Sequence, residues 1–227
     1  MATATISSIT LPVENGQHID GDLNVPEGAI GLVVFAHGSG SSRHSARNIA
    51  VAVTLQGRHL GTLLADLLTS QEESVDTFTA EYRFDIPRLG RRVVAMIDWI
   101  RGQPQLARLP VGCFGASTGA AAALIAAAER PAVVQAVVSR GGRPDLANAA
   151  LPRVTAPTLL IVGGNDEPVI DMNQDAMSRM RAGARVELAI VPGASHLFEE
   201  PGTLQEVERL TGDWFVHDLP GRNAVAD

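Results

Sequence analysis

The segment FGASTGAAAAL, residues 114–124, decides how the rest of the chain is arranged. Alanine is the best helix former and glycine nearly the poorest, so the segment predicts a sharp turn that leads into a helix. Ser117 lies at this turn, within a match to the pattern G-x-S-x-G from Gly115 to Gly119. The pattern typically places a serine above a sheet, on a turn too crowded for side chains at the two glycines. A match this short also arises by chance, so a glycine-rich turn without chemistry is the alternative.

Apolar runs that predict buried strands recur on both sides of this segment. They cover residues 29–36, 59–68, 109–116, 133–140, 157–164 and 185–191, and two earlier segments around Asn15-Gly16 predict a hairpin. Apolar residues at helical spacing predict helices over 44–56, 86–101, 117–129, 171–182 and 202–218. Strands that alternate with helices indicate an α/β protein with a mostly parallel sheet and helices on both faces. Residues 68–84 are predicted to form a long irregular loop.

The composition predicts one globular domain over residues 1–227. Hydrophobic residues make up 45% of the chain and charged residues 19%, which argues against disorder. A net charge of -7 disfavours a nucleic-acid partner. The N-terminal residues lack the pattern of a signal peptide, and no apolar run approaches the ~18 residues of a membrane span. We therefore expect a cytoplasmic protein with neither a nucleic-acid nor a membrane partner.

Candidate catalytic residues follow the predicted strands, because ligands of open parallel sheets bind at the carboxyl ends of the strands. A serine nucleophile needs a base and the base needs an orienting acid, in the chain order serine, acid, histidine. Asp166 follows the strand 157–164, and His196 follows the strand 185–191. Taken alone, a loop histidine is usually a surface residue and a loop aspartate a helix cap. The ordered match favours a triad of Ser117, His196 and Asp166.

Two backbone amides are expected to bind the oxyanion that forms when a serine attacks a carbonyl. The first is the amide of Thr118, the residue after the nucleophile. The second is the amide of Ser39, in the loop HGSGSSRH (residues 37–44) after the first long apolar strand. His37 in the same loop is expected to support it, because the chain order assigns the base to His196. A generic glycine- and serine-containing loop is the alternative.

These segments resemble the dienelactone hydrolase-like family of the α/β-hydrolase superfamily. The resemblance covers nearly the whole chain and rests on the segments VVFAHGSGSSRHSARN, FGASTGAAAAL, VVSRGGRPDLA, APTLLIVGGND and VPGASHLFEEPG. They look especially like a subgroup whose relatives also occur fused to phosphoribosyltransferase domains. The resemblance implies an α/β-hydrolase fold with about eight strands, little or no cap domain, and ester or lactone hydrolysis without a cofactor. Dienelactone hydrolase itself uses a cysteine nucleophile, whereas Cys113 here is expected to be buried behind Ser117.

Arginines near the strand ends are candidates for substrate binding, because the guanidinium group binds carboxylates and phosphates bidentately. The resemblance implies that arginines hold a substrate carboxylate, and the candidates are Arg43, Arg140 and Arg143. Arg47 also lies just after the loop that contains Ser39. The alternative is that Arg140 and Arg143 pair with acids such as Asp145 and only order a loop. The sequence does not decide between these roles.

The sequence thus predicts a serine hydrolase that cleaves carboxylic esters or lactones through an acyl-enzyme. Few residues are inserted between the predicted elements, so we expect an open site and small, short-acyl substrates. No cluster of histidines and carboxylates has the spacing of metal ligands, and no metal or cofactor is expected. An acyltransferase with the same triad, or a non-catalytic binding protein with this fold, is the alternative. The oligomeric state is left open, with a homodimer among the expected states.

Overall fold

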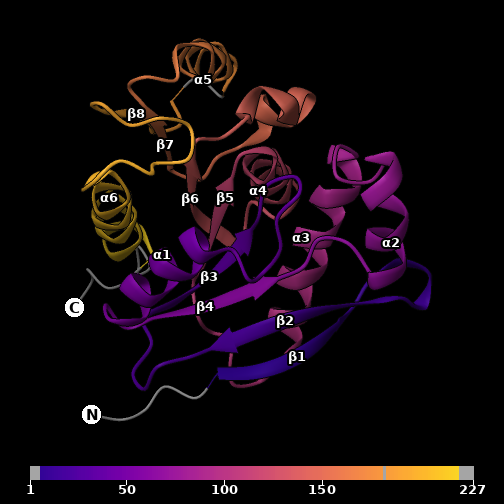
Figure 1. Ribbon diagram of the computed structural model, residues 1–227. Helices are drawn as coiled ribbons and strands as arrows, with labels where there is room; N and C mark the ends of the chain where they lie inside the picture. Colours follow the sequence, from indigo (N-terminus) through magenta and orange to yellow (C-terminus); the bar gives the residue numbers. More distant parts are fainter. Residues whose placement is uncertain (1–5, 181–182, 220–227) are drawn as a thin grey trace.

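The computed structural model describes residues 6–180 and 183–219, and within them eight strands form one sheet (Figure 1). The strands are β1 (Ile6–Pro12), β2 (His18–Asn24), β3 (Gly31–Ala36), β4 (Leu60–Ala65), β5 (Val111–Ala116), β6 (Val134–Arg140), β7 (Thr158–Gly163) and β8 (Val186–Val191). Their order is β1-β2-β4-β3-β5-β6-β7-β8. Within this sheet β2 runs antiparallel to β1 and β4 and every other pair of neighbours is parallel, which confirms the predicted mostly parallel α/β architecture.

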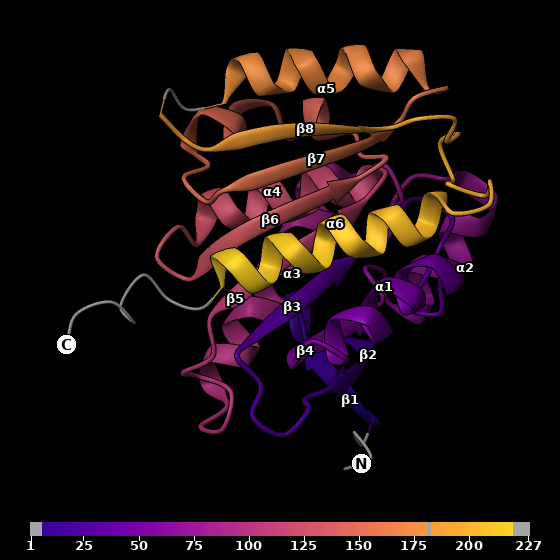
Figure 2. The same cartoon turned by 90° about the vertical axis from the view of Figure 1, so that its left-hand side faces the viewer.

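Helices cover both faces of the sheet. They are α1 (Ala46–Gln56), α2 (Ser70–Thr79), α3 (Ile86–Gly102), α4 (Thr118–Glu129), α5 (Glu167–Arg179) and α6 (Thr203–Asp218), with short 3-10 segments at Glu14–Gly16 and Pro144–Arg153. Figure 2 shows α1 and α6 in front of the strands, and both pack into the core on that face. The opposite face is covered by α3, α4 and α5.

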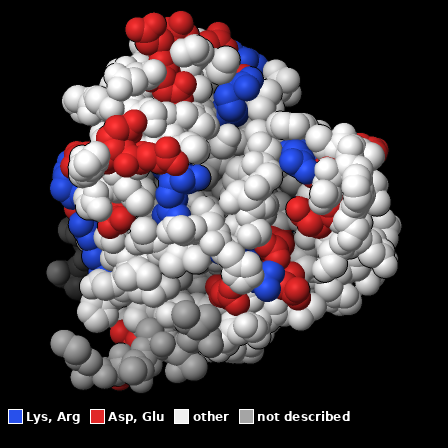
Figure 3. Space-filling view, in the orientation of Figure 1, with Lys and Arg blue, Asp and Glu red and all other residues white. Residues whose placement is uncertain are grey.

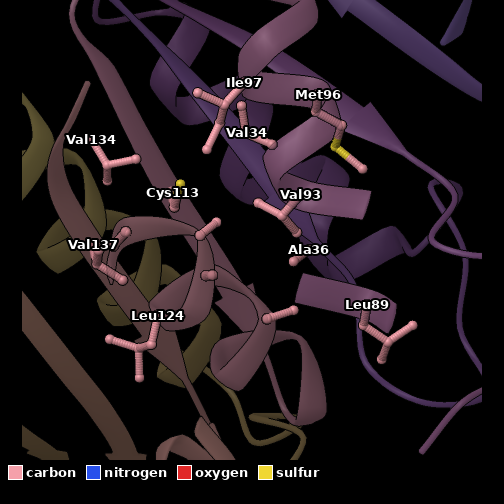
Figure 4. Packing of buried hydrophobic residues seen from close by; sticks show 14 of the residues in the cluster. Val34, Ala36, Leu89, Val93, Met96, Ile97, Cys113, Leu124, Val134 and Val137 are labelled. Atoms are coloured by element: carbon pink, nitrogen blue, oxygen red, sulfur yellow. The ribbon is translucent and has the colours of Figure 1, made fainter. Parts of the chain in front are cut away.

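The core between the sheet and α3 and α4 consists of closely packed aliphatic side chains (Figure 4). Val93 and Ile97 of α3 lie beside Val34 of β3 and Cys113 of β5. Burial raises the pKa of the Cys113 thiol to about 12. The thiol therefore stays protonated at neutral pH and is a core group, as its position before Ser117 suggests.

The central position of β5 determines where the elbow serine lies. All six residues of β5 are buried, and the strand pairs with β3 on one side and β6 on the other. Ser117 follows β5 directly and precedes α4. The carboxyl ends of β3, β5, β6, β7 and β8 point to the same edge of the sheet because these strands are parallel. Residues that follow these strands can therefore meet around Ser117.

The prediction of an irregular loop over residues 68–84 is wrong, because the structure contains the helix α2 there. Thr69 begins it with a capping box, in which the Thr69 hydroxyl accepts from the Glu72 amide and the Glu72 carboxylate accepts from the Thr69 amide. Asp76 then accepts the backbone amides of Tyr82 and Arg83 and so holds the segment after the helix. The helix is polar, with few apolar residues at helical spacing, and the prediction relied on that spacing.

Other helix boundaries differ by a few residues from those predicted. α5 begins at Glu167, four residues before the predicted start at 171, and the predicted end at 182 lies outside the described residues. No helix within the described ranges is both long and apolar enough to cross a membrane. On the face shown in Figure 3, uncharged residues predominate, and positive and negative side chains lie in small mixed groups. This face therefore carries no broad basic surface.

Candidate active site

Ser117 occupies a strained backbone conformation between β5 and α4. Its φ is 50° and its ψ is -123°, a region that residues other than glycine rarely adopt. Backbone hydrogen bonds hold it there: the Ser117 amide donates to the Arg140 carbonyl at 3.2 Å, and the Arg143 amide donates to the Ser117 carbonyl at 3.0 Å. The turn is therefore tied to the end of β6. Strain of this kind that the surrounding structure maintains is typical of functional sites.

The glycines around Ser117 are required by close packing. A Cβ atom at Gly119 would overlap the carbonyl oxygen of Ala36, and one at Gly115 would overlap the backbone of Ala120. A Cβ at Gly38 would lie 2.9 Å from the Cβ of Ser117. The predicted crowding at positions 115 and 119 is thus present, and it brings the end of β3 against the start of α4.

Asp166 and His196 meet beyond the ends of β7 and β8. The His196 Nδ1 atom lies 2.6 Å from the Asp166 Oδ2 atom, and Asp166 is largely buried. Asp166 occupies the N-cap position of α5 but makes no side-chain cap bond, so its carboxylate is available to the histidine. With Nδ1–H donating to Asp166, the Nε2 atom of His196 is left as a hydrogen-bond acceptor.

The loop that carries His196 is held closely over the sheet edge. The Ser195 amide donates to the Glu200 carboxylate at 3.0 Å. A Cβ atom at Gly141 would lie 2.9 Å from the His196 carbonyl oxygen, so the absence of a side chain there lets the loop approach β6. The bond between Glu200 and this loop could not be read from the sequence.

Ser117 and His196 line the same cavity, which has a volume of about 260 Å³. Among the hydrogen bonds of the described residues, none joins the Ser117 hydroxyl to His196. Catalytic hydrogen bonds of this kind often tighten only when substrate is bound. The structure therefore brings the serine to the histidine–aspartate pair, in the spatial arrangement that the chain order suggests.

One of the two expected oxyanion donors is already engaged. The Ser39 amide donates to the Thr118 hydroxyl oxygen at 2.9 Å. It is therefore not the free donor that the sequence predicts. Thr118 is the first residue of α4, where backbone amides have no partner within the helix. The sequence does not indicate this role of the Thr118 hydroxyl, because its contact with the Ser39 amide joins residues 79 positions apart.

His37 supports the loop that contains Ser39. Its Nε2 atom accepts the Leu67 amide at 3.1 Å, which leaves the proton on Nδ1 to be donated to the Gly38 carbonyl at 2.9 Å. Burial lowers the pKa of His37, although the Gly38 carbonyl, Asp66 and Glu73 partly oppose this effect. The imidazole is therefore neutral at pH 7 and joins the loop after β3 to the loop after β4.

Two of the three candidate arginines lie outside the cavity and are paired with acids. Arg43 contacts the carboxylate of Asp66 and lies 3.4 Å from that of Asp22. Arg143 donates to both oxygens of Asp145, at 2.9 and 2.8 Å. Arg143 thus makes the loop-ordering contact with Asp145, and Arg43 does not line the cavity. Of the three candidate substrate-binding arginines, only Arg140 lies at the cavity.

Arg140 lines the cavity beside Ser117, together with Arg47 and Asn48. Its side chain is buried and donates to the Asn48 side-chain oxygen at 3.2 Å. Within the described part of the chain it forms no ion pair with a carboxylate. Burial first, and the charge of Arg47 second, lower the pKa of Arg140 to about 10. Asn48 at the cavity is a residue that the sequence did not single out.

The described residues contain no group of three or more histidines, cysteines, aspartates or glutamates that could hold a metal ion. The site therefore consists of a serine elbow, a histidine–aspartate pair, backbone amides and two arginines. A strained serine after the central strand of a mostly parallel eight-stranded sheet, with acid and histidine after later strands, defines the class of α/β-hydrolase folds.

The chain belongs to the dienelactone hydrolase family, whose model matches residues 20–212. A solved dienelactone hydrolase from Anabaena variabilis ATCC 29413 is 55% identical, with a TM-score of 0.92 over 95% of this chain and 99% of that chain. A more distant structure, the ferulic acid complex of Est1E from Butyrivibrio proteoclasticus, shares the fold at 15% identity and a TM-score of 0.78, over 94% of this chain and 100% of that chain.

Curated relatives are longer than this chain. Two proteins from Mycobacterium tuberculosis strains, each named "Putative phosphoribosyl transferase", are 54% identical over 203 residues. The match covers 89% of this chain but only 44% of each relative. The chain therefore spans less than half the length of these relatives, in agreement with the resemblance to a subgroup that also occurs in fused form.

Proposed function

We propose that this protein hydrolyses carboxylic esters or lactones through a covalent acyl-enzyme on Ser117. The observation that carries the proposal is the 2.6 Å contact between His196 and Asp166 at the cavity that Ser117 also lines. An acid that orients a histidine next to a serine at the same cavity is the arrangement that activates a hydroxyl for attack. The family membership supports hydrolysis, and the serine mechanism is an inference from the geometry.

In the proposed mechanism, the Ser117 hydroxyl attacks the carbonyl carbon of the substrate. His196 takes the hydroxyl proton on Nε2 and then donates it to the leaving alkoxide. Asp166 keeps the Nδ1 proton in place and stabilises the imidazolium. Water then attacks the acyl-enzyme with His196 again as the base, which releases the acid and restores Ser117.

The oxyanion of the tetrahedral intermediate is proposed to bind the amides of Thr118 and Ser39. The Thr118 amide at the start of α4 is aided by the helix dipole. The Ser39 amide must exchange its bond to the Thr118 hydroxyl for one to the oxyanion. The exchange is favourable when the acceptor is charged, because charge-assisted hydrogen bonds are roughly twice as strong as neutral ones.

The size of the cavity supports small substrates. Its volume of about 260 Å³ lies just below the range of roughly 300–1,000 Å³ that is typical of small-molecule sites. A short acyl group or a small lactone fits such a volume, whereas a long acyl chain would extend into solvent. We therefore propose a preference for short-acyl esters.

Hydrolysis of p-nitrophenyl acetate, butyrate and octanoate by the wild type and by Ser117→Ala tests the proposal. We expect acetate and butyrate to be cleaved faster than octanoate, and Ser117→Ala to lose at least about 10³-fold in kcat. A fluorophosphonate probe should label Ser117, as identified by mass spectrometry. A wild type that neither hydrolyses these esters nor reacts with the probe would refute the mechanism and favour a binding protein.

A further inference from the structure

Arg140 is a buried cation for which the described chain supplies no anion. Only 6% of the residue is exposed. Among the described residues, its one side-chain hydrogen bond goes to Asn48, a neutral group, and its buried Nε atom has no hydrogen-bond partner. Burying a charge is costly unless the charge is paired and its hydrogen bonds are satisfied. The arrangement therefore calls for an anionic group from outside the chain.

Arg47 adds a second positive charge to the same cavity. Its Nη1 atom lies 3.6 Å from the carboxylate of Glu199, which is itself exposed to solvent. Its Nε atom is buried and forms no hydrogen bond with any residue that the structure describes. Two guanidinium groups with unused donors thus lie at one cavity wall, and their mutual repulsion would be relieved by a bound anion.

The amino-terminal end of α1 forms part of this wall. Ser45, the N-cap residue of this eleven-residue helix, lines the cavity together with Arg47 and Asn48 of its first turn. Backbone amides at a helix N-terminus and the helix dipole favour anions, phosphate in particular. Ser41 and Ser45, whose hydroxyl groups can donate, also line the cavity, and the Ser45 hydroxyl accepts the Asn48 amide at 3.4 Å.

The number of charges and donors fits a phosphate monoester better than a carboxylate. A phosphate monoester carries about −1.5 to −2 charges at pH 7 and three strong acceptor oxygens. A carboxylate carries one charge and two oxygens, and Arg140 alone could satisfy it bidentately. Two arginines, a helix N-terminus and two serine hydroxyls would be matched by the larger anion.

We propose that Arg140, Arg47 and the first turn of α1 form a subsite for a phosphate monoester group carried by the substrate. The inference rests on the proposed hydrolysis at Ser117, because the subsite and the serine line one cavity of about 260 Å³. A substrate that reaches both is a small ester or lactone with a phosphate a few bonds from the carbonyl. The phosphate is bound and not transferred, since only the carboxylic ester bond is cleaved.

Binding of inorganic phosphate, measured by titration calorimetry, tests the subsite without catalysis. The wild type and Ser117→Ala should bind phosphate, and Arg140→Gln and Arg47→Gln should bind it at least about tenfold more weakly. Arg143→Gln is the matched control, because this arginine lies three residues after Arg140 but is paired with Asp145. Arg47 is partly exposed, so we expect Arg47→Gln to fold. This variant keeps the test valid if Arg140→Gln does not fold. Equal phosphate binding by Arg47→Gln and the wild type would overturn the subsite.

Three matched esters test its role in substrate choice: acetoxypropyl phosphate, acetoxybutyrate and neutral acetoxypropanol. We expect kcat/KM to be at least about tenfold higher for the phosphate than for either other ester, and Arg47→Gln to remove this difference. Equal rates for all three, or a preference for acetoxybutyrate, would overturn the inference. Phosphate binding without hydrolysis of any ester would refute the proposed function and support the anion subsite.

Discussion

At the scale of single residues, the site combines groups that the sequence predicts with contacts that it does not. The positions of Ser117, Asp166 and His196 follow from chain order, because each lies in the segment that follows a strand reaching the same edge of the sheet. The burial of Arg140 and the engagement of the Ser39 amide depend on contacts between residues far apart in the chain. Such contacts leave no local pattern, so the sequence cannot separate Arg140 from the paired Arg143.

Asp166→Asn is expected to lower kcat roughly 10³- to 10⁴-fold while the fold is kept. The amide cannot hold the Nδ1 proton of His196 as the carboxylate does, so the histidine would adopt the wrong tautomer for proton transfer. Steady-state hydrolysis of p-nitrophenyl acetate measures the loss. Asp145→Asn serves as the control, because Asp145 pairs with Arg143 outside the cavity. A loss below tenfold for Asp166→Asn would contradict the assigned role.

At the scale of elements, periodicity predicts the buried strands and amphipathic helices well, because burial imposes the apolar pattern. The strands from β3 to β7 are buried throughout most of their length and appear in the sequence as continuous apolar runs. α2 was missed because most of its residues face solvent. The signal that could have found it is the spacing of Thr69 and Glu72, which is that of a capping box.

Thr69→Ala is expected to reduce the free energy of unfolding by about 1 kcal/mol, since it removes the hydroxyl that accepts the Glu72 amide. For a protein of this size the melting temperature should fall by roughly 2–4 °C. Urea titration and thermal unfolding followed by circular dichroism measure both changes. Ser74→Ala, on the exposed side of α2, is the matched control and should change stability little. Equal effects of the two substitutions would argue against the capping role.

At the scale of the whole molecule, polar contacts join the loops that follow the carboxyl ends of the strands. His37 connects the loops after β3 and β4 through its two ring nitrogens, and it must be neutral to accept the Leu67 amide. Its pKa is lowered in the folded state, mainly by burial. The unfolded chain therefore binds a proton more readily than the folded one, and the stability of the molecule is coupled to pH.

We expect the free energy of unfolding to be highest above the unfolded-state pKa of about 6.5 for histidine and to fall as the pH drops towards the folded-state pKa of His37. Urea titrations of the wild type between pH 5 and pH 7.5, a range spanning roughly one unit or more on each side of the unfolded value, measure this slope. In His37→Gln the slope should be smaller, because the titrating group is gone. His44→Asn, which replaces an exposed histidine, should retain the wild-type slope. A wild-type slope in His37→Gln would show that other groups cause it.

The absence of a side chain at Gly119 has a consequence for how this protein can evolve. Because the start of α4 rests on the backbone of Ala36, the position of Ser117 relative to the loop after β3 is set by main-chain contact. That contact involves no side chain that lines the cavity. Arg47 and Arg140, by contrast, are proposed to contact the substrate through their side chains. Single substitutions at Arg47 or Arg140 should therefore change which substrate is bound and leave the proposed position of Ser117 unchanged.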